Sequence, residues 1–287
     1  MQPTRLVAVG VLAAVLGLAA GEAPAARVAV ISNSNTAEVA ADFTSSLTGH
    51  SFTPIDVSIS VPGSIAALVP AFDAVLLFED GRFANATPTG DLVAAFAATG
   101  RPVVLGSFYD KDRSDSGGSG AGYGWGALEA IDPNTTDGIG IPTGGQQRSL
   151  NPARTRRHPL TEGVDALFAN KWAGGNEAKA GTRVVAEWQE TNARNRVDPA
   201  IAYRVTGAAC VIQIGIIPHY PSVKTGGNVA GTDYGGDYYR VWQNAFDFAD
   251  KRCVVPPPSV PTLSHAALLL LGLGLGAVAW RERRRAA

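Results

Sequence analysis

Apolar residues in the first part of the chain fall into short, nearly continuous runs that alternate with helical patterns. The runs at residues 27–32, 51–57, 73–79 and 101–107 predict strands, because such runs are typical of strands covered by helices on both faces. Asn35 and Glu38 predict a capped helix start. Thr87 and the following proline predict another helix, which Gly100 ends. This alternation predicts a parallel sheet with right-handed crossover connections.

The alternation stops near residue 108 and resumes in a different form. Residues 108–159 are rich in glycine and predict a long insertion loop, and loops of that length are usually functional or disordered. Strands predicted at 182–188, 200–205 and 209–216 follow one another closely, which favours antiparallel partners. Residues 237–250 predict a final helix with its apolar side chains on one face.

The C-terminal end combines a short motif, an uncharged apolar run and a basic cluster. The motif is Val260, Pro261, Thr262, Leu263 and Ser264, the run extends from Ala266 to Trp280, and the cluster is Arg281, Arg283, Arg284 and Arg285. The run gives about 22 Å of helix. A bilayer core is about 30 Å thick, so the span must borrow flanking residues or thin the membrane. The alternative, a buried C-terminal helix, is disfavoured by the abrupt basic stop.

This tail resembles the IPTL-CTERM class of bacterial C-terminal sorting signals, a relative of the PEP-CTERM class. It departs from the class pattern at Val260, where isoleucine is usual, and at His265-Ala266, where a Glu-Trp pair is common. The resemblance implies a membrane-anchored precursor that an intramembrane sorting protease of the cell envelope recognises and cleaves. It also makes exopolysaccharide, with which the class is associated, a candidate partner.

The N-terminal end has the pattern of a secretory leader. Arg5 precedes an apolar run from Leu6 to Ala20, and small residues at 23–25 offer a cleavage site. A first transmembrane anchor is the alternative. The two ends together predict an exported protein, whose precursor is anchored in the inner membrane and faces the periplasm. Processing would then release it to the cell surface or the extracellular matrix.

These signals divide the chain into four parts. We expect a signal peptide at residues 1–25 and an ectodomain at 26–253. A proline-rich linker with the sorting motif follows at 254–264, and a transmembrane sorting tail occupies 265–287.

Composition fits a globular ectodomain. Of 24 Lys and Arg and 25 Asp and Glu, the terminal segments hold five arginines and two glutamates, so the ectodomain carries a net charge of about −4. Without a basic stripe, nucleic-acid binding has no electrostatic support. Cys210 and Cys253 are the two cysteines. An oxidising envelope would allow them to pair, and the alternative is two unpaired residues with Cys210 buried.

Residues 27–250 resemble the class I glutamine amidotransferase-like fold. The resemblance is carried by the opening strand, Phe78-Glu79-Asp80-Gly81, Gly106-Ser107, His158-Pro159-Leu160 before Gly163, and Gly215-Ile216-Ile217-Pro218-His219. It implies an α/β fold, a flavodoxin-like three-layer sandwich with a mostly parallel sheet. This chain would add the long Gly-rich insertion loop and a C-terminal transmembrane helix.

The same resemblance indicates two candidate catalytic residues. Ser107 stands at the turn where the family has its cysteine nucleophile, and His219 matches the family's histidine. Neither Cys210 nor Cys253 lies at that turn, so the family's thiolate chemistry is absent. Bulky residues follow Ser107, whereas a nucleophile elbow requires small flanking residues. Pro221 stands where the family has an orienting acid.

Other polar residues favour structural roles. Glu79 and Asp80 end a strand where open sheets bind ligands, but adjacent strand residues point to opposite faces, so a turn role is favoured. Asp110, Asp112 and Asp115 miss the calcium-loop spacing. Tyr234, Tyr238 and Tyr239 are candidates for a carbohydrate platform, although Tyr238 also belongs to the apolar face of the final helix. His158 is a candidate turn residue.

We therefore expect no metal site and no cofactor. The favoured hypothesis is an exported envelope protein with a non-catalytic binding or structural ectodomain. The alternative is a divergent hydrolase that uses Ser107 and His219.

Overall fold

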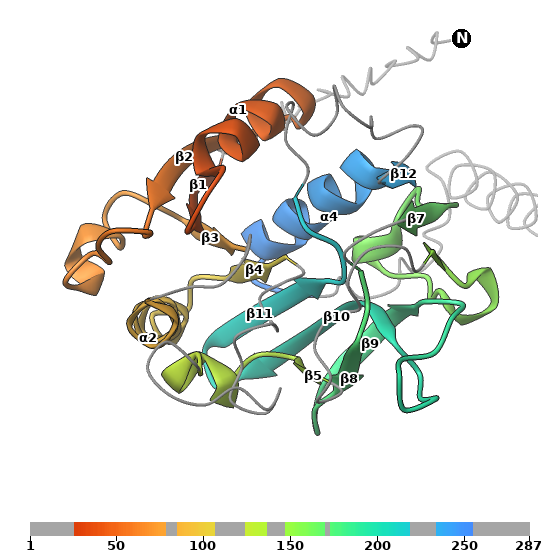
Figure 1. The fold of residues 1–287 in the computed structure, drawn as a ribbon. Coiled ribbons are helices and arrows are strands. Elements are labelled where there is room, and N and C mark those ends of the chain that lie inside the picture. Colours follow the sequence, from red (N-terminus) through yellow and green to blue (C-terminus); the bar gives the residue numbers. More distant parts are fainter. Residues whose placement is uncertain are drawn as a thin grey trace, which may run out of the picture.

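A seven-stranded mixed sheet forms the centre of the molecule (Figure 1). The computed structural model describes residues 26–78, 85–106, 124–136, 147–169, 173–218 and 234–254. In the order β2-β1-β3-β4-β11-β10-β9, the sheet contains β2 (His50–Asp56), β1 (Ala26–Ser32), β3 (Ala74–Leu77), β4 (Val103–Leu105), β11 (Ala209–Ile214), β10 (Pro199–Thr206) and β9 (Arg183–Glu187).

The first five strands of this order are parallel, and β10 is antiparallel to both of its neighbours. With β11 as the fifth strand, the parallel part has the order of a doubly wound, flavodoxin-like sheet. The prediction of a mixed α/β fold with a mostly parallel sheet is confirmed. The antiparallel pairing predicted for the late strands is confirmed as well.

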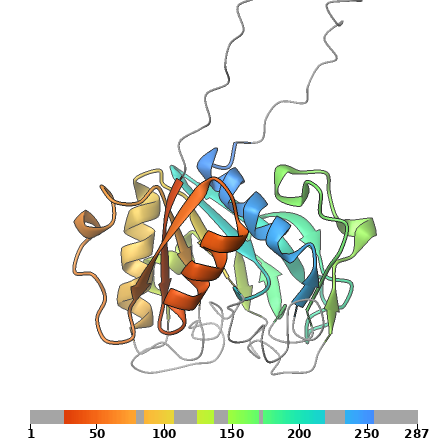
Figure 2. The same ribbon diagram turned by 90° about the horizontal axis from the view of Figure 1, so that it is seen from above.

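Helices cover both faces of the sheet (Figures 1 and 2). α1 (Thr36–Ser46) and α4 (Tyr238–Asp250) lie on one face, and α2 (Ala86–Ala98) lies on the other with two short helices, η1 (Ile65–Ala67) and η3 (Gly126–Ala130). Side chains alternate along each strand between the two layers. Val28 of β1 packs with α1 and α4, whereas Ala29 packs with α2. This explains why the strands read as continuous apolar runs.

Aromatic side chains join α1, α4 and β2. The ring of Phe43 lies 5.4 Å from that of Trp242, 6.0 Å from Phe246 and 5.5 Å from Phe52. The predicted apolar face of the final helix is confirmed, since all six of its members are buried: Tyr238, Val241, Trp242, Ala245, Phe246 and Ala249.

The predicted insertion loop contains regular structure, so the expectation of a continuous loop over 108–159 is wrong in part. The described residues of this region include η3, β5 (Asn134–Thr136), β6 (Arg148–Ser149) and η4 (Pro152–Arg154). η3 packs on α2, where the Ala127 amide donates to Asp91 at 2.7 Å. Further short elements are η5 (Pro159–Thr161), β7 (Leu167–Ala169), β8 (Asn176–Ala178) and β12 (Tyr234–Gly236). The short strands form two small sheets, one in the order β12-β7-β6 and the other a pair of β5 and β8.

Two helix starts differ from their predictions. Asn35 precedes α1 as expected, but it adopts a left-handed backbone (φ 55°) and its side chain makes no capping hydrogen bond. α2 begins at Ala86, so Thr87 lies inside the helix. Its hydroxyl donates to the Gly124 carbonyl at 2.7 Å and ties the η3 segment to α2. Gly100 ends this helix in a left-handed conformation (φ 82°), as predicted.

The described chain begins and ends on the same side of the molecule (Figure 2). Ala26 opens β1 at the amino edge of the parallel strands, and α4 returns to that edge, where Ala26 and Arg252 border one cavity. Within the described residues no helix is long and apolar enough to cross a bilayer. The predicted leader and C-terminal span lie outside those residues.

Candidate functional site

The neighbouring parallel strands β3, β4 and β11 end side by side at the carboxyl edge of the sheet. Gly106 follows β4, and a side-chain carbon on it would lie 2.8 Å from Pro218 Cδ and 2.9 Å from Phe78 Cβ. Phe78 follows β3, and Pro218 follows β11. Glycine is therefore required at 106, because any side chain there would collide with the ends of both neighbouring strands.

The candidate catalytic residues follow the two partners of this contact in the sequence. Ser107 and His219, with Glu79 and Asp80, are outside the described residues, as are Asp110, Asp112 and Asp115. The sorting motif and the basic cluster of the C-terminal tail are outside them too. The structure does describe the residues that precede two of these segments. Gly106 immediately precedes Ser107 and Pro218 immediately precedes His219, and Gly106 and Pro218 are packed together.

The expectation of a tyrosine platform is wrong for Tyr234, and Tyr238 lies on the buried face of the final helix, where the helical pattern places it. Tyr234 and Tyr238 are each 1 % exposed, and their rings stack 5.7 Å apart. Tyr239 is half-buried, and its hydroxyl donates to Asp42 Oδ1 at 3.0 Å. The rings of Tyr234 and Tyr238 belong to the core that α4 forms with the sheet, so these two offer no exposed stacking surface.

His158 is a helix cap, in line with its predicted turn role. Its Nδ1 accepts a hydrogen bond from the Leu160 amide at 3.2 Å, and the Thr161 side chain accepts one from the His158 amide. The ring packs 4.9 Å from Phe248. Burial lowers the pKa of His158, and the charge of Arg183 lowers it further. The neutral ring is therefore the form that fits this position.

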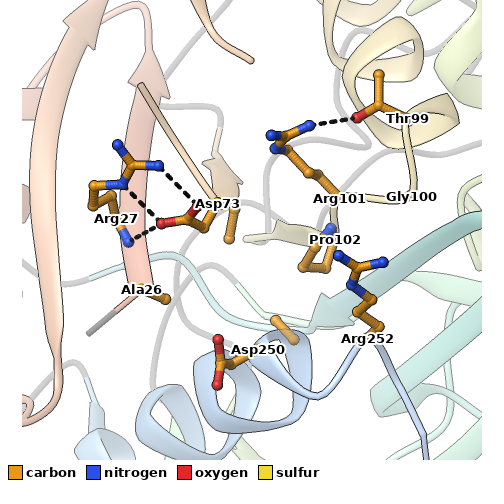
Figure 3. Close-up of a pocket in the computed structure, with 11 residues that line it drawn as sticks. Ala26, Arg27, Asp73, Thr99, Gly100, Arg101, Pro102, Asp250 and Arg252 are labelled. Carbon is orange, nitrogen blue, oxygen red and sulfur yellow. Dashed lines mark hydrogen bonds and ion pairs between the residues drawn. The ribbon is translucent and has the colours of Figure 1, made fainter. Parts of the chain in front are cut away.

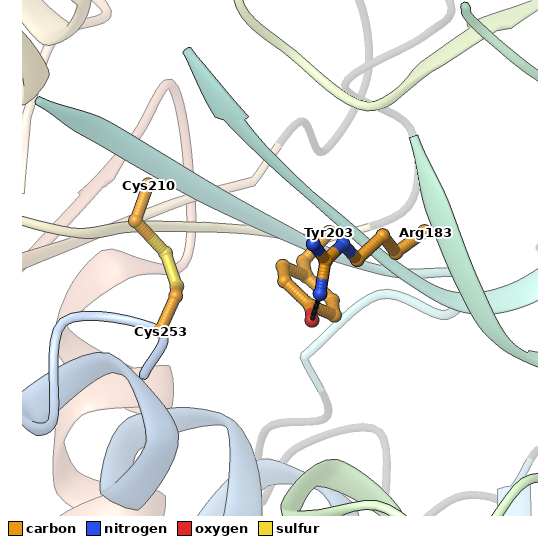
Figure 4. Close-up of a disulfide and its surroundings, with 4 residues drawn as sticks. All are labelled: Arg183, Tyr203, Cys210 and Cys253. Carbon is orange, nitrogen blue, oxygen red and sulfur yellow. Dashed lines mark hydrogen bonds between the residues drawn. A yellow bond between two sulfur atoms is a disulfide. The ribbon is translucent and has the colours of Figure 1, made fainter. Parts of the chain in front are cut away.

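Cys210 and Cys253 are joined by a disulfide (Figure 4). Their Cα atoms are 6.1 Å apart, within the usual range of about 4.4–6.8 Å. The end of α4 delivers Cys253 to this place. The Arg252 amide donates to Ala249, and the Cys253 amide donates to Phe248, the pair of bonds that defines a Schellman motif with Arg252 in the left-handed region.

The structure contains a polar cavity that the sequence did not indicate (Figure 3). It has a volume of about 570 Å³ and lies at the amino edge of β1, β3 and β4, beside the end of α4. Its charged lining comes from segments far apart in the chain: Arg27, Asp73, Arg101, Asp250 and Arg252.

The charges around this cavity are unevenly paired. Arg27 binds Asp73 in a bidentate pair, with Nε–Oδ2 and Nη2–Oδ1 distances of 2.9 Å. The hydrogen bond from Arg27 lowers the pKa of Asp73. Arg101 donates a long bond, 3.4 Å, to the Thr99 hydroxyl, and its charge contributes to the lowered pKa of Asp73. Among the described residues, Arg101 and Arg252 have no carboxylate within salt-bridge distance.

A further ion pair is buried and structural. Arg148 and Asp198 are 1 % and 0 % exposed, with Nη1–Oδ2 at 2.7 Å. Asp198 also accepts the Gly175 and Asn176 amides, and Arg148 donates to the carbonyls of Glu190 and Thr191. This network holds β6 and the start of β8 against the loop between β9 and β10. Within the described residues, no three His, Cys, Asp or Glu side chains gather as metal ligands.

Comparison with known families identifies the tail. Residues 258–285 match the IPTL-CTERM motif. The chain thus carries a C-terminal sorting signal, which is consistent with an exported, envelope-associated protein. A comparison with curated proteins finds no match.

Several solved structures share the fold at low identity. A cytoplasmic protein from Salmonella typhimurium LT2 is 14% identical over 78% of this chain and 99% of its own, with a TM-score of 0.54. A β-galactosidase from Rahnella sp. R3 is 13% identical over 80% of this chain but only 32% of its own, with a TM-score of 0.50. A glutamine amidotransferase from Thermotoga maritima is 10% identical over 67% of this chain and 75% of its own, with a TM-score of 0.40. The first two similarities describe the fold alone, and the third adds nothing to that argument.

Proposed function

We propose that the chain is an exported protein of the cell envelope whose ectodomain, residues 26–253, binds or builds surface material. The sorting motif at 258–285 is the observation that carries this proposal. In it, an intramembrane protease of the envelope processes the anchored precursor, and exopolysaccharide is the candidate partner of the released ectodomain.

The disulfide supports the same location independently. Disulfides persist in oxidising compartments and are rare in the cytosol. Cys210–Cys253 closes a 43-residue separation between the central sheet and the last turn after α4. It therefore fixes the end of the ectodomain just before the linker that leads to the tail, where a tethered domain would otherwise fray.

Fractionation of the native organism tests this proposal. In one variant Arg281, Arg283, Arg284 and Arg285 are replaced by glutamine, and in the matched control they are replaced by lysine. We expect wild type and the lysine control to appear as a processed envelope product, because positive charge fixes the cytoplasmic side of the span. The glutamine variant should accumulate unprocessed. Equal processing of all three proteins would contradict this role of the basic cluster.

A divergent hydrolase is the second candidate, and one contact favours it. β4 and β11 are neighbouring parallel strands, and Gly106 packs against Pro218 at their carboxyl ends. The chain therefore enters the segments of Ser107 and His219 from adjoining points, at the edge where such sheets bind ligands. A serine–histidine pair needs this proximity.

A fluorophosphonate probe, which labels activated serines, separates the two candidates. The hydrolase reading predicts labelling that Ser107→Ala and His219→Ala both abolish. Ser58→Ala, at an exposed serine beyond β2, should leave it unchanged. Wild-type protein that takes up no label would contradict the hydrolase.

A further inference from the structure

The described chain begins with β1 and ends after α4 on the same side of the molecule, at the amino edge of the sheet (Figure 2). The proposed membrane anchor therefore follows in the sequence from this edge. Ten residues separate Val254 from the predicted tail at 265. A fully extended chain of that length spans about 35 Å, and Pro256-Pro257-Pro258 stiffens it.

This tether favours one orientation of the domain. With the amino edge towards the bilayer, the linker runs directly to the membrane. In the opposite orientation it would first have to pass back along the sheet, about 23 Å for a strand of seven residues, and β1 has that length. Most of the linker's reach would then be lost.

The edge that this orientation turns towards the membrane carries the polar cavity (Figure 3). Arg27 is neutralised by Asp73, whereas Arg101 and Arg252 have no carboxylate within salt-bridge distance among the described residues. Asp250 is the one remaining acid of the lining, and the charge of the neighbouring Lys251 acts on Asp247 outside it. The lining therefore holds three arginines and two aspartates, a surplus of one positive charge around a cavity of about 570 Å³, in an ectodomain whose overall net charge is negative.

We infer that this cavity binds the phosphate headgroups of anionic membrane lipids and docks the ectodomain on the bilayer that anchors it. The inference rests on the proposed function, because it takes the C-terminal span as the anchor. Arg101 and Arg252 pair with lipid phosphates, the interaction for which the guanidinium group is best suited. The carboxyl edge, with Gly106 and Pro218, then faces away from the membrane, towards the periplasm.

Hydrogen exchange on the full-length chain in lipid nanodiscs tests this inference. One set of discs contains phosphatidylglycerol, and the other contains only phosphatidylcholine. We expect slower amide exchange at residues 99–103 and 250–254 in phosphatidylglycerol discs, and no difference at residues 188–198 on the opposite edge. Salt at 1 M should remove the difference, because it shortens the screening length to about 3 Å.

A pair of variants with equal charge change sharpens the test. Arg101→Gln with Arg252→Gln should lower the docking constant about 30-fold, since each arginine near an anionic surface contributes about fivefold. The control is Arg194→Gln with Arg196→Gln. Both arginines are exposed and contact Glu177 at the opposite edge. This control should change docking less than twofold.

The outcomes are distinct. Equal exchange in both lipids, or an equal loss in the control variant, overturns the headgroup site. Protection in phosphatidylcholine discs by soluble glycerol phosphate assigns the cavity to a free phosphate and overturns the lipid. A chain that does not co-elute with discs overturns the anchor instead. Sedimentation with phosphatidylglycerol vesicles would then decide the headgroup site alone.

Discussion

Reduction of the disulfide should destabilise the ectodomain by a calculable amount. The bond closes a loop of 43 residues between Cys210 and Cys253. The chain-entropy relation gives about 13 cal/mol/K for such a loop, or about 4 kcal/mol at 25 °C. With an m-value of about 3 kcal/mol/M in urea, the unfolding midpoint should fall by about 1.3 M.

Urea titration of the processed protein measures this shift, with and without a reductant, by fluorescence of the buried Trp125, Trp188 and Trp242. The double variant Cys210→Ala with Cys253→Ala is the control, because its midpoint must not respond to reductant. Identical midpoints for oxidised and reduced wild type would refute the reasoning. So would two reactive thiols in protein taken directly from the envelope.

Three further predictions concern other parts of the fold. Because the pKa of His158 is lowered in the folded protein, the unfolded chain binds a proton at this residue more readily. The free energy of unfolding should therefore fall as the pH drops below about 6.5. A His158→Asn variant, measured by thermal unfolding across pH, should lose this dependence. Asp198→Ala removes the carboxylate that faces the buried guanidinium of Arg148 and should cost about 3–5 kcal/mol in urea unfolding; a cost below about 1 kcal/mol would contradict the burial. Gly106→Val forces Pro218 away and should cost about 1–3 kcal/mol, and a variant as stable as wild type would show that the strand ends are not packed together.

The parallel half of the sheet could be predicted because its strands are covered on both faces. Val28 and Ala29 face different helical layers, and both are fully buried. Such strands stand out as unbroken apolar runs in any sequence. The last helix was equally clear, since thirteen residues are enough to show a helical period on one face.

The short strands could not be predicted, because two or three residues show no period. β6 is Arg148–Ser149, and the buried Arg148 is neutralised by Asp198, fifty residues later in the chain. Tyr234 stands beside Gly235 and Gly236, which made it a candidate ligand-binding residue. In the structure β12 pairs with β7, and the ring of Tyr234 is buried. In both cases tertiary partners decided the structure, and the local sequence carried no sign of them.

The candidate site divides in the same way. The pairing of Cys210 with Cys253 could be offered from the sequence, with the unpaired alternative left open. The amino-edge cavity could not, because its residues come from β1, the turn before β3, the turn before β4 and the end of α4. That these residues lie close together can be inferred only when the order of the strands in the sheet is known.

The C-terminal sorting motif is shown, and we propose that the N-terminal end is an export signal of the same envelope protein. The most direct test is the intact mass of the protein purified from the native organism, with both ends sequenced. We expect an oxidised product that begins near Ala26 and ends before the apolar run at Ala266. A full-length chain of 287 residues, recovered from the cytosol with both thiols free, would contradict it.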